Sequence, residues 1–339
     1  MSQALLDRPF DPELKPGAHN AVFVCLKVQP DEKVTLITDR ACEEIAASLA
    51  SELHECGSPF STFVLEDLAQ RPLTAMPQTI LDDMESSDVS IFAVHAQQNE
   101  LKTRMQMCEV VNRKGLRHAH MVNIEKKIML EGMRANFDQV DELTLRVMNI
   151  VKTAKCIRAR APAGTDIRAT LTPDYKWIKT SGIISREKWG NLPGGETFTS
   201  PLEVNGTFVV DGVVGDYLCA KFGDLAATPL TLTIEKNRLT GAQCENTQLE
   251  SEFWEYTHRD ANSDRVGEFA IGTNLACTRI VGNILQDEKI PGVHMAFGDP
   301  YGAHTGAKWT SSTHIDVVGT NFDIWADDRQ IMSGGKFLV

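Results

Sequence analysis

Apolar and polar positions are arranged in two different ways along the chain of 339 residues. Between about residues 20 and 160, apolar runs such as VTLITD (34–39) and VSIFAVHA (89–96) are each followed by a helical stretch. Strands that alternate with helices are typical of βαβ units, whose strands pair in parallel. We therefore expect residues 1–160 to form an α/β scaffold domain with a mostly parallel sheet.

The pattern changes near residue 160. Short β-prone runs are now separated by Gly, Pro and Thr, as in SGIISREKWGNLPGGETFTSP (181–201). Frequent turns between short strands indicate a twisted, mostly antiparallel β structure. We expect residues 161–339 to form a second, β-rich domain, so the predicted fold class is α/β plus α+β.

Composition narrows the range of functions. The formal net charge is −12, and no Lys/Arg stripe interleaved with aromatic residues suggests a nucleic-acid partner. No apolar run approaches the roughly 20 residues of a membrane span, and the N-terminal stretch is polar rather than signal-like. The eight cysteines are scattered without C-x-x-C spacing, as in proteins of a reducing compartment. We expect a cytoplasmic protein that binds neither nucleic acids nor membranes.

The stretch STHIDVV (312–318) places two polar groups where a buried strand would carry apolar side chains. Because side chains alternate along a strand, His314 and Asp316 share one face, and Ile315 and Val317 share the other. The pair can be a hydrogen-bonded couple within the core or two ligands of a metal ion. Further residues of the second domain bear on this choice.

Several other residues with ligand chemistry occupy unusual positions in the same domain. Glu268 is embedded in the apolar run VGEFAIG, where an ionised carboxylate needs a partner or a metal ion. Others lie at turns, at a helix end or at a strand start: Glu196, Glu288, His294 and Tyr301. Each of these four, taken alone, also has a purely structural explanation.

The set as a whole suits two metal ions. Four carboxylates balance the charge of two divalent cations held close together, and neutral imidazoles fill the remaining positions. Mixed oxygen and nitrogen ligands favour Zn²⁺, Co²⁺ or Mn²⁺ over Mg²⁺. Two such ions lower the pKa of a water molecule between them and bind a substrate carbonyl. The set therefore predicts amide hydrolysis.

These motifs, in this order, resemble the thermophilic aminopeptidase T family, the M29 leucyl aminopeptidases with two metal ions. The similarity extends from about Gly164 onward through GTDIRATL, NLPGGETFTSP, GEFAIG, DEK, VHMAFGDPYG and THIDVV. The resemblance implies six metal ligands in the second domain: Glu196, Glu268, Glu288, His294, His314 and Asp316. It further implies that Glu268 and Asp316 bridge the two ions, that Tyr301 assists catalysis and that the protein is a homodimer.

A second resemblance is to the mononuclear iron dioxygenase that opens the ring of 2,5-dihydroxypyridine. This enzyme shares the His-x-Asp motif and the pattern IDVVGTNFDIWADD, and it uses a third histidine near the position of Ala270. Two histidines and one carboxylate suit Fe(II) and O₂ chemistry. Ala270 and the retained glutamates favour hydrolysis, whereas His258 is the nearest substitute and lies in a charged helical stretch. One Fe(II) with ring opening of a small heteroaromatic substrate is the alternative.

We therefore expect a metal-dependent hydrolase, an aminopeptidase that acts on a peptide or a related small amide. A non-peptidase hydrolase built on the same fold is a third possibility. Only 20 positions separate His294 from His314, a segment shorter than in the family, so the substrate class is left open. His118 and His120 share a strand face in the first domain, where we expect a structural role because no carboxylate motif accompanies them.

Overall fold

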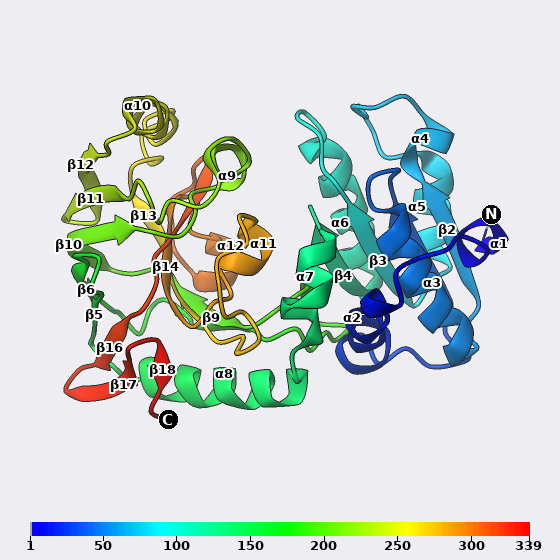
Figure 1. Ribbon diagram of the computed structural model, residues 1–339, viewed down its shortest axis with the longest axis horizontal. Helices are drawn as coiled ribbons and strands as arrows, with labels where there is room; N and C mark the ends of the chain where they lie inside the picture. The colour runs from blue at the N-terminus through cyan, green and yellow to red at the C-terminus, as the bar shows by residue number, and fades with distance from the viewer. Residues whose placement is uncertain (1) are drawn as a thin grey trace. The chain divides into compact units, whose positions relative to one another are not determined.

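The computed structural model describes residues 2–339 (Figure 1) and consists of two compact units. The first comprises the chain up to Asp138 together with Gly182–Gly194, and the second comprises Gln139–Ser181 and Gly195–Val339. One unit holds a parallel sheet and the other holds two antiparallel sheets, which confirms the predicted fold class. None of the described helices has the length and apolar character that crossing a bilayer requires.

These units differ from the expected division at residue 160 in two segments. Helix α8 (Phe137–Val151) contributes Val147 and Val151 to the hydrophobic core of the second unit, so most of this helix belongs there. Strand β8 (Gly190–Asn191) pairs in parallel with β4, which places Gly182–Gly194 in the first unit. Long-range packing and pairing, which local pattern does not reveal, determine both assignments.

The first unit is built on a five-stranded parallel sheet with the order β2-β1-β3-β4-β8. Its longer strands are β1 (Val34–Thr38), β2 (Phe60–Val64), β3 (Val89–Val94) and β4 (Arg117–Val122). Every residue of β1 and β3 is buried, as expected for parallel strands covered on both faces. The helical segments are α1 (Ser2–Leu6), η1 (Pro12–Leu14), α2 (Lys15–His19), η2 (Asn20–Cys25), α3 (Glu43–Cys56), α4 (Leu65–Leu68), α5 (Gln78–Glu85), α6 (Leu101–Lys114), α7 (Lys126–Leu130) and η3 (Gly132–Arg134).

Helix α3 shows how local sequence sets the limits of an element. Glu43 and Glu44 lie in its first turn, where negative charge interacts favourably with the helix dipole. The helix ends at Gly57, whose φ of 79° is a left-handed conformation that glycine adopts readily.

The second unit contains two antiparallel sheets that share one hydrophobic core. The eight-stranded sheet has the order β12-β11-β10-β6-β5-β16-β17-β18, and the five-stranded sheet has the order β15-β14-β13-β9-β7. The strands of the larger sheet are β5 (Cys156–Arg160), β6 (Asp166–Thr170), β10 (Glu203–Val210), β11 (Leu230–Glu235), β12 (Arg238–Gln243), β16 (Asp323–Ala326), β17 (Arg329–Ser333) and β18 (Lys336–Phe337). The smaller sheet consists of β7 (Ile178–Thr180), β9 (Glu196–Thr199), β13 (Val266–Gly272), β14 (Gly292–Gly298) and β15 (His314–Val318). Four further helices are α9 (Asp216–Phe222), α10 (Thr247–Tyr256), α11 (Ile284–Asp287) and α12 (Gly302–Thr305).

Candidate metal centre

One face of the five-stranded sheet carries ligand-type side chains, and the other face belongs to the core. Glu268 of β13 pairs with Ala296 of β14, which pairs with Asp316 of β15, so these three side chains form a row. The alternating residues Phe269 and Phe297 are buried in the hydrophobic core. Strand alternation thus separates the polar face from the apolar one.

Neighbouring positions on the same face complete the set. His294 pairs with Ala270, Glu196 of β9 pairs with Gly272, and His314 pairs with Gly298. These three partners are Ala or Gly, so the longer polar side chains extend over small neighbours on that side, whereas Val318 and Thr180 flank His294 and Glu196 on the other.

A β-bulge determines which face Glu268 occupies. The register between β13 and β14 shifts between Val266 and Glu268, which makes Gly267 an extra residue in the strand. A Cβ atom at Gly267 would lie 2.5 Å from the carbonyl oxygen of Gly298, so only glycine fits there. Because a shift of one residue moves a side chain to the opposite face, the bulge is part of the site.

All six residues expected to be metal ligands lie in one cluster. Three overlapping groups have ligand atoms within 4.8 Å of one another: Glu196–Glu268–His294, Glu268–His314–Asp316 and Glu288–His294–Asp316. The fold thereby unites residues as far apart in the chain as positions 196 and 316. Such proximity is the geometric requirement for a shared metal site, and the role of the six as ligands stays a prediction.

Glu268 lies between the two histidines. Its Oε1 is 3.5 Å from Nε2 of His294, and its Oε2 is 3.7 Å from Nε2 of His314. Nε2 of His314 also lies 3.4 Å from Oδ1 of Asp316. Glu268 thus has one oxygen near each histidine, and its role as a bridging ligand stays a prediction.

Two buried atoms of the cluster have no hydrogen-bond partner among the described residues. These atoms are Oε2 of Glu196 and Nε2 of His294, which lie 3.3 Å apart. Buried polar atoms are nearly always paired, and one bound group between these two atoms would pair with both. A cation would do so, and the mixed carboxylate and imidazole donors fit a divalent transition metal. The residues present therefore fit the metal ions that the resemblance implies.

Outer contacts orient two of the candidate ligands. Nδ1 of His314 lies 3.0 Å from the backbone carbonyl of Asp299, and a proton on this nitrogen leaves the lone pair of Nε2 facing the cluster. The hydroxyl of Thr180 donates a hydrogen bond of 2.8 Å to Oε1 of Glu196. Partners of this kind fix the orientation of metal ligands.

Lys289 is part of the cluster, although it is not among the six predicted ligands. Its side chain is 1% exposed, and its ammonium donates to Oε1 of Glu196 at 2.7 Å and to Oε1 of Glu288. Asp287, also without an assigned role, accepts hydrogen bonds from the backbone N–H groups of residues 281–283 and so holds the loop before α11. The available signal was the charged run DEK (287–289), which lies two residues before the buried strand β14.

The charges of the cluster shift its pKa values strongly. Burial would raise the pKa of Glu196, but Lys289 and His294 hold this pKa well below its ordinary value. Burial opposes protonation of the two histidines, yet the adjacent carboxylates raise the pKa of His294 and of His314 to about 10. Burial raises the pKa of Glu288 to about 8, against the attraction of Lys289. The metal-free cluster therefore holds protons where metal ions would bind.

Tyr301 stands beside the cluster. Its ring centroid lies 4.4 Å from that of His314, and the residue as a whole is 41% exposed. Its φ of 49° is uncommon for a residue with a side chain, and such backbone strain is frequent at functional sites. Burial of its hydroxyl and the nearby carboxylates, Glu268 foremost, raise its pKa well above the ordinary value. The phenol is thus protonated and available as a donor.

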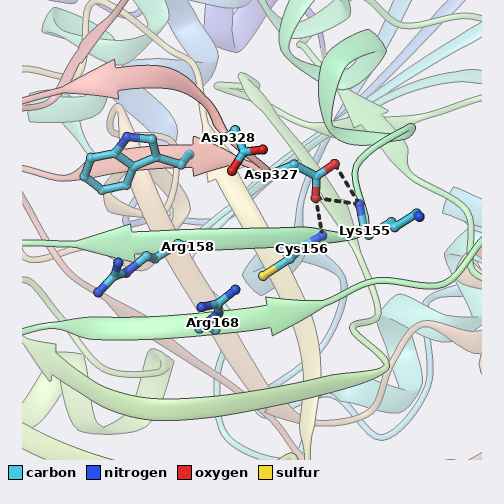
Figure 2. A pocket seen from close by; sticks show the side chains of 7 residues that line it. Lys155, Cys156, Arg158, Arg168, Asp327 and Asp328 are labelled. Carbon is cyan, nitrogen blue, oxygen red and sulfur yellow. Dashed lines mark hydrogen bonds between the residues drawn. The ribbon is translucent and has the colours of Figure 1, made fainter.

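Other features of the second unit lie outside the cluster. His258 stacks on Trp254 with ring centroids 4.1 Å apart and is exposed, as expected for a surface residue. A surface cavity of about 660 Å³ is lined by Lys155, Cys156, Arg158, Arg168, Trp325, Asp327 and Asp328 (Figure 2). Asp327 accepts hydrogen bonds from the backbone N–H groups of Lys155 and Cys156, so this carboxylate serves the fold. Within the described chain, none of the predicted site residues lines this cavity.

Comparison with curated proteins finds a relative that is a dioxygenase. The chain is 27% identical over 208 residues to 2,5-dihydroxypyridine 5,6-dioxygenase of Pseudomonas putida. The match covers 58% of this chain and 57% of the relative, so the chain spans little more than half of that protein's length.

Two solved structures share the fold. AmpT from Thermus thermophilus superposes with a TM-score of 0.73 at 15% identity, over 98% of this chain and 100% of the other. The 2,5-dihydroxypyridine dioxygenase of P. putida superposes with a TM-score of 0.69 at 15% identity, over 96% of this chain and 97% of the other. At such low identity these similarities establish the fold alone.

The family model of the thermophilic metalloproteases (M29) matches residues 128–333. This match covers more than half of the chain and every residue of the cluster, and it confirms the resemblance inferred from the motifs. The protein therefore belongs to the thermophilic metalloprotease (M29) family.

Proposed function

We propose that this metalloprotease-family protein is an aminopeptidase, which removes the N-terminal residue of a peptide or cleaves a related amino-acid amide. The observation that carries the proposal is the cluster of six ligand-type residues around the unpaired atoms of Glu196 and His294. The cluster would hold two divalent ions, with Zn²⁺, Co²⁺ and Mn²⁺ as the candidates. The homodimer expected from the resemblance stays a prediction.

The residues of the chain have distinct roles in this proposal. When bound, divalent ions in such a cluster supply an acidified water molecule as nucleophile and polarise the scissile carbonyl. Tyr301, protonated and adjacent to His314, donates a hydrogen bond to the oxyanion that develops on that carbonyl.

The composition of the groups favours hydrolysis over ring opening. Each of the three groups of ligand atoms contains one histidine and two carboxylates. The iron triad of ring-opening chemistry requires two histidines and one carboxylate. Ala270, which pairs with His294, provides no further nitrogen ligand on this face. The relative at 27% identity keeps the dioxygenase as the second candidate function.

Metal content tests the proposal directly. We expect about two divalent ions per chain in protein purified without chelators, measured by plasma mass spectrometry, and hydrolysis of amino-acid amides and dipeptides. Glu268→Ala removes the carboxylate whose two oxygens lie 3.5 Å from His294 and 3.7 Å from His314, and it should lower metal content and activity together. Glu235→Ala, an exposed position of β11, is the matched control and should change neither.

One iron per chain, with O₂ uptake in the presence of 2,5-dihydroxypyridine, would instead establish the ring-opening candidate. Protein that binds no metal ion at all would contradict both functions.

A further inference from the structure

Lys289 places a buried ammonium group among the carboxylates of the candidate metal cluster. Lysine is almost never fully buried unless it is paired, and a buried charge is stable only with well-placed partners. The two partners here are Glu196 and Glu288, both candidate metal ligands. The ammonium therefore occupies carboxylate oxygens that a metal ion would also use.

The backbone of Lys289 is anchored, so its side chain starts from a fixed point. Its N–H donates to the carbonyl of Gln286 at 2.8 Å, and its own carbonyl accepts from the N–H of Asn274 at 3.0 Å. The hydroxyl of Thr180 shares Oε1 of Glu196 with the ammonium. This carboxylate is therefore held in place without any metal ion.

The ammonium divides the cluster into two unequal halves. The group Glu268–His314–Asp316 contains no residue bonded to Lys289. The groups that contain His294 each include one carboxylate that the ammonium already neutralises in part, Glu196 in one and Glu288 in the other. A divalent ion near His294 meets both a weaker negative field and repulsion from a neighbouring positive charge.

We propose that Lys289 is a positioning residue that makes the two halves of the cluster bind metal ions with unequal affinity. The half around Glu268, His314 and Asp316 binds the first ion tightly. The half around Glu196, Glu288 and His294 binds the second ion more weakly, and Lys289 keeps its carboxylates in place while that ion is absent. The inference rests on the proposed function, because it requires that the cluster bind metal.

A zinc titration of the metal-free full-length protein against a chromophoric chelator tests the inference. The wild-type protein should take up Zn²⁺ in two steps of different affinity. In Lys289→Met the affinity of the second step should rise by about tenfold or more, because the ammonium no longer repels the incoming ion, while the affinity of the first step changes little. Lys289→Arg, which keeps the charge, should preserve two unequal steps. Lys221→Met removes an ammonium from the Lys221–Glu252 pair at the surface of α9 and is the matched control.

Thermal unfolding supplies a readout that does not depend on activity. Metal-free Lys289→Met should unfold at a lower temperature than the wild type, because two buried carboxyl groups lose their cation. Added Zn²⁺ should raise the unfolding temperature of this variant by more than it raises that of the wild type. If this variant does not fold without metal, Lys289→Gln replaces it in the same titration, since its amide still donates a hydrogen bond.

The outcomes separate the inference from the proposed function. Two equal steps in the wild type, or unequal steps unaltered in both neutral variants, would overturn the role of Lys289 and leave the metal site intact. A wild-type protein that binds no Zn²⁺ and no other divalent ion would overturn the proposed function and the inference with it.

Discussion

Two pairs of polar residues, each two positions apart on one strand, differ in chemistry. One pair is His118 and His120 in the first unit, and the other is His314 and Asp316 in the second unit. In β4 of the first unit, Nδ1 of His118 lies 2.8 Å from the hydroxyl of Ser90, and its Nε2 lies 3.1 Å from Nδ1 of His120. Burial lowers the pKa of His118 to about 3 and that of His120 well below its ordinary value. In β15 of the second unit, carboxylates, Asp316 foremost, overcome burial and raise the pKa of His314 to about 10.

The comparison shows that spacing brings side chains together, whereas neighbours determine what they can do. His120 stacks on Phe92 and lies near Trp189, with ring centroids 5.4 and 5.6 Å away. An imidazole among aromatic rings and a hydroxyl is most stable when neutral, so that pair suits a structural role. An imidazole among carboxylates attracts protons or metal ions instead.

Exchange of one histidine in each unit for alanine gives the largest expected effect. His314→Ala should lower metal affinity and hydrolysis by more than the roughly 100-fold that loss of an outer partner costs, because a direct ligand is removed. His118→Ala should leave metal content unchanged but lower the free energy of unfolding by about 2–4 kcal/mol through a buried cavity and lost hydrogen bonds. Metal analysis and chemical denaturation measure both variants. Equal metal loss in the two variants would contradict the comparison.

Removal of a single hydroxyl at the second unit's cluster has a smaller expected effect. Tyr301→Phe should lower kcat about 100-fold, the cost of one lost oxyanion donor, without change in metal content. Steady-state kinetics on an amino-acid amide measure this change. Tyr217→Phe is the matched control, since the hydroxyl of Tyr217 contacts Glu252 at the surface. Unaltered kcat in Tyr301→Phe would exclude a catalytic role for the phenol.

A change of pH should alter metal affinity in smaller steps than these substitutions do. Both histidines of the cluster have a pKa of about 10 in the metal-free protein and must lose their protons to bind metal. Affinity should therefore rise with pH up to about 10, roughly tenfold per pH unit for each proton released. Calorimetry in buffers of different ionisation enthalpy counts these protons. Affinity independent of pH would show that the histidines are not ligands.

The same pKa values set the stability of the metal-free protein. A folded-state pKa above the ordinary 6.5 means that the folded protein holds these protons more tightly than the unfolded chain. This contribution to stability is fully present below about pH 6.5 and is lost as the pH rises through about 10. Bound metal ions should remove this dependence, because the histidines are then unprotonated.

Local sequence predicted the elements of the site better than its contacts. The alternation in HIDVV placed His314 and Asp316 on one strand face, and the structure has this strand. The extra residue Gly267 was not predicted, because a bulge is defined only by pairing with β14. Lys289 was also missed, since a lysine that follows Asp287 and Glu288 in the chain is usually solvated, and only the fold shows that this one is buried.

The sequence by itself determined the kinds of element, the strand face that His314 and Asp316 share and, through its ordered motifs, the metalloprotease family. Each of these features depends on neighbouring residues or on motif order, which the sequence displays directly. Only the tertiary structure decided that four strands and the end of α11 bring six ligand-type residues within reach of one another, with a buried ammonium between two of them. Strand order, register and burial arise from contacts between distant segments, and those contacts set the charge environment on which the chemistry depends.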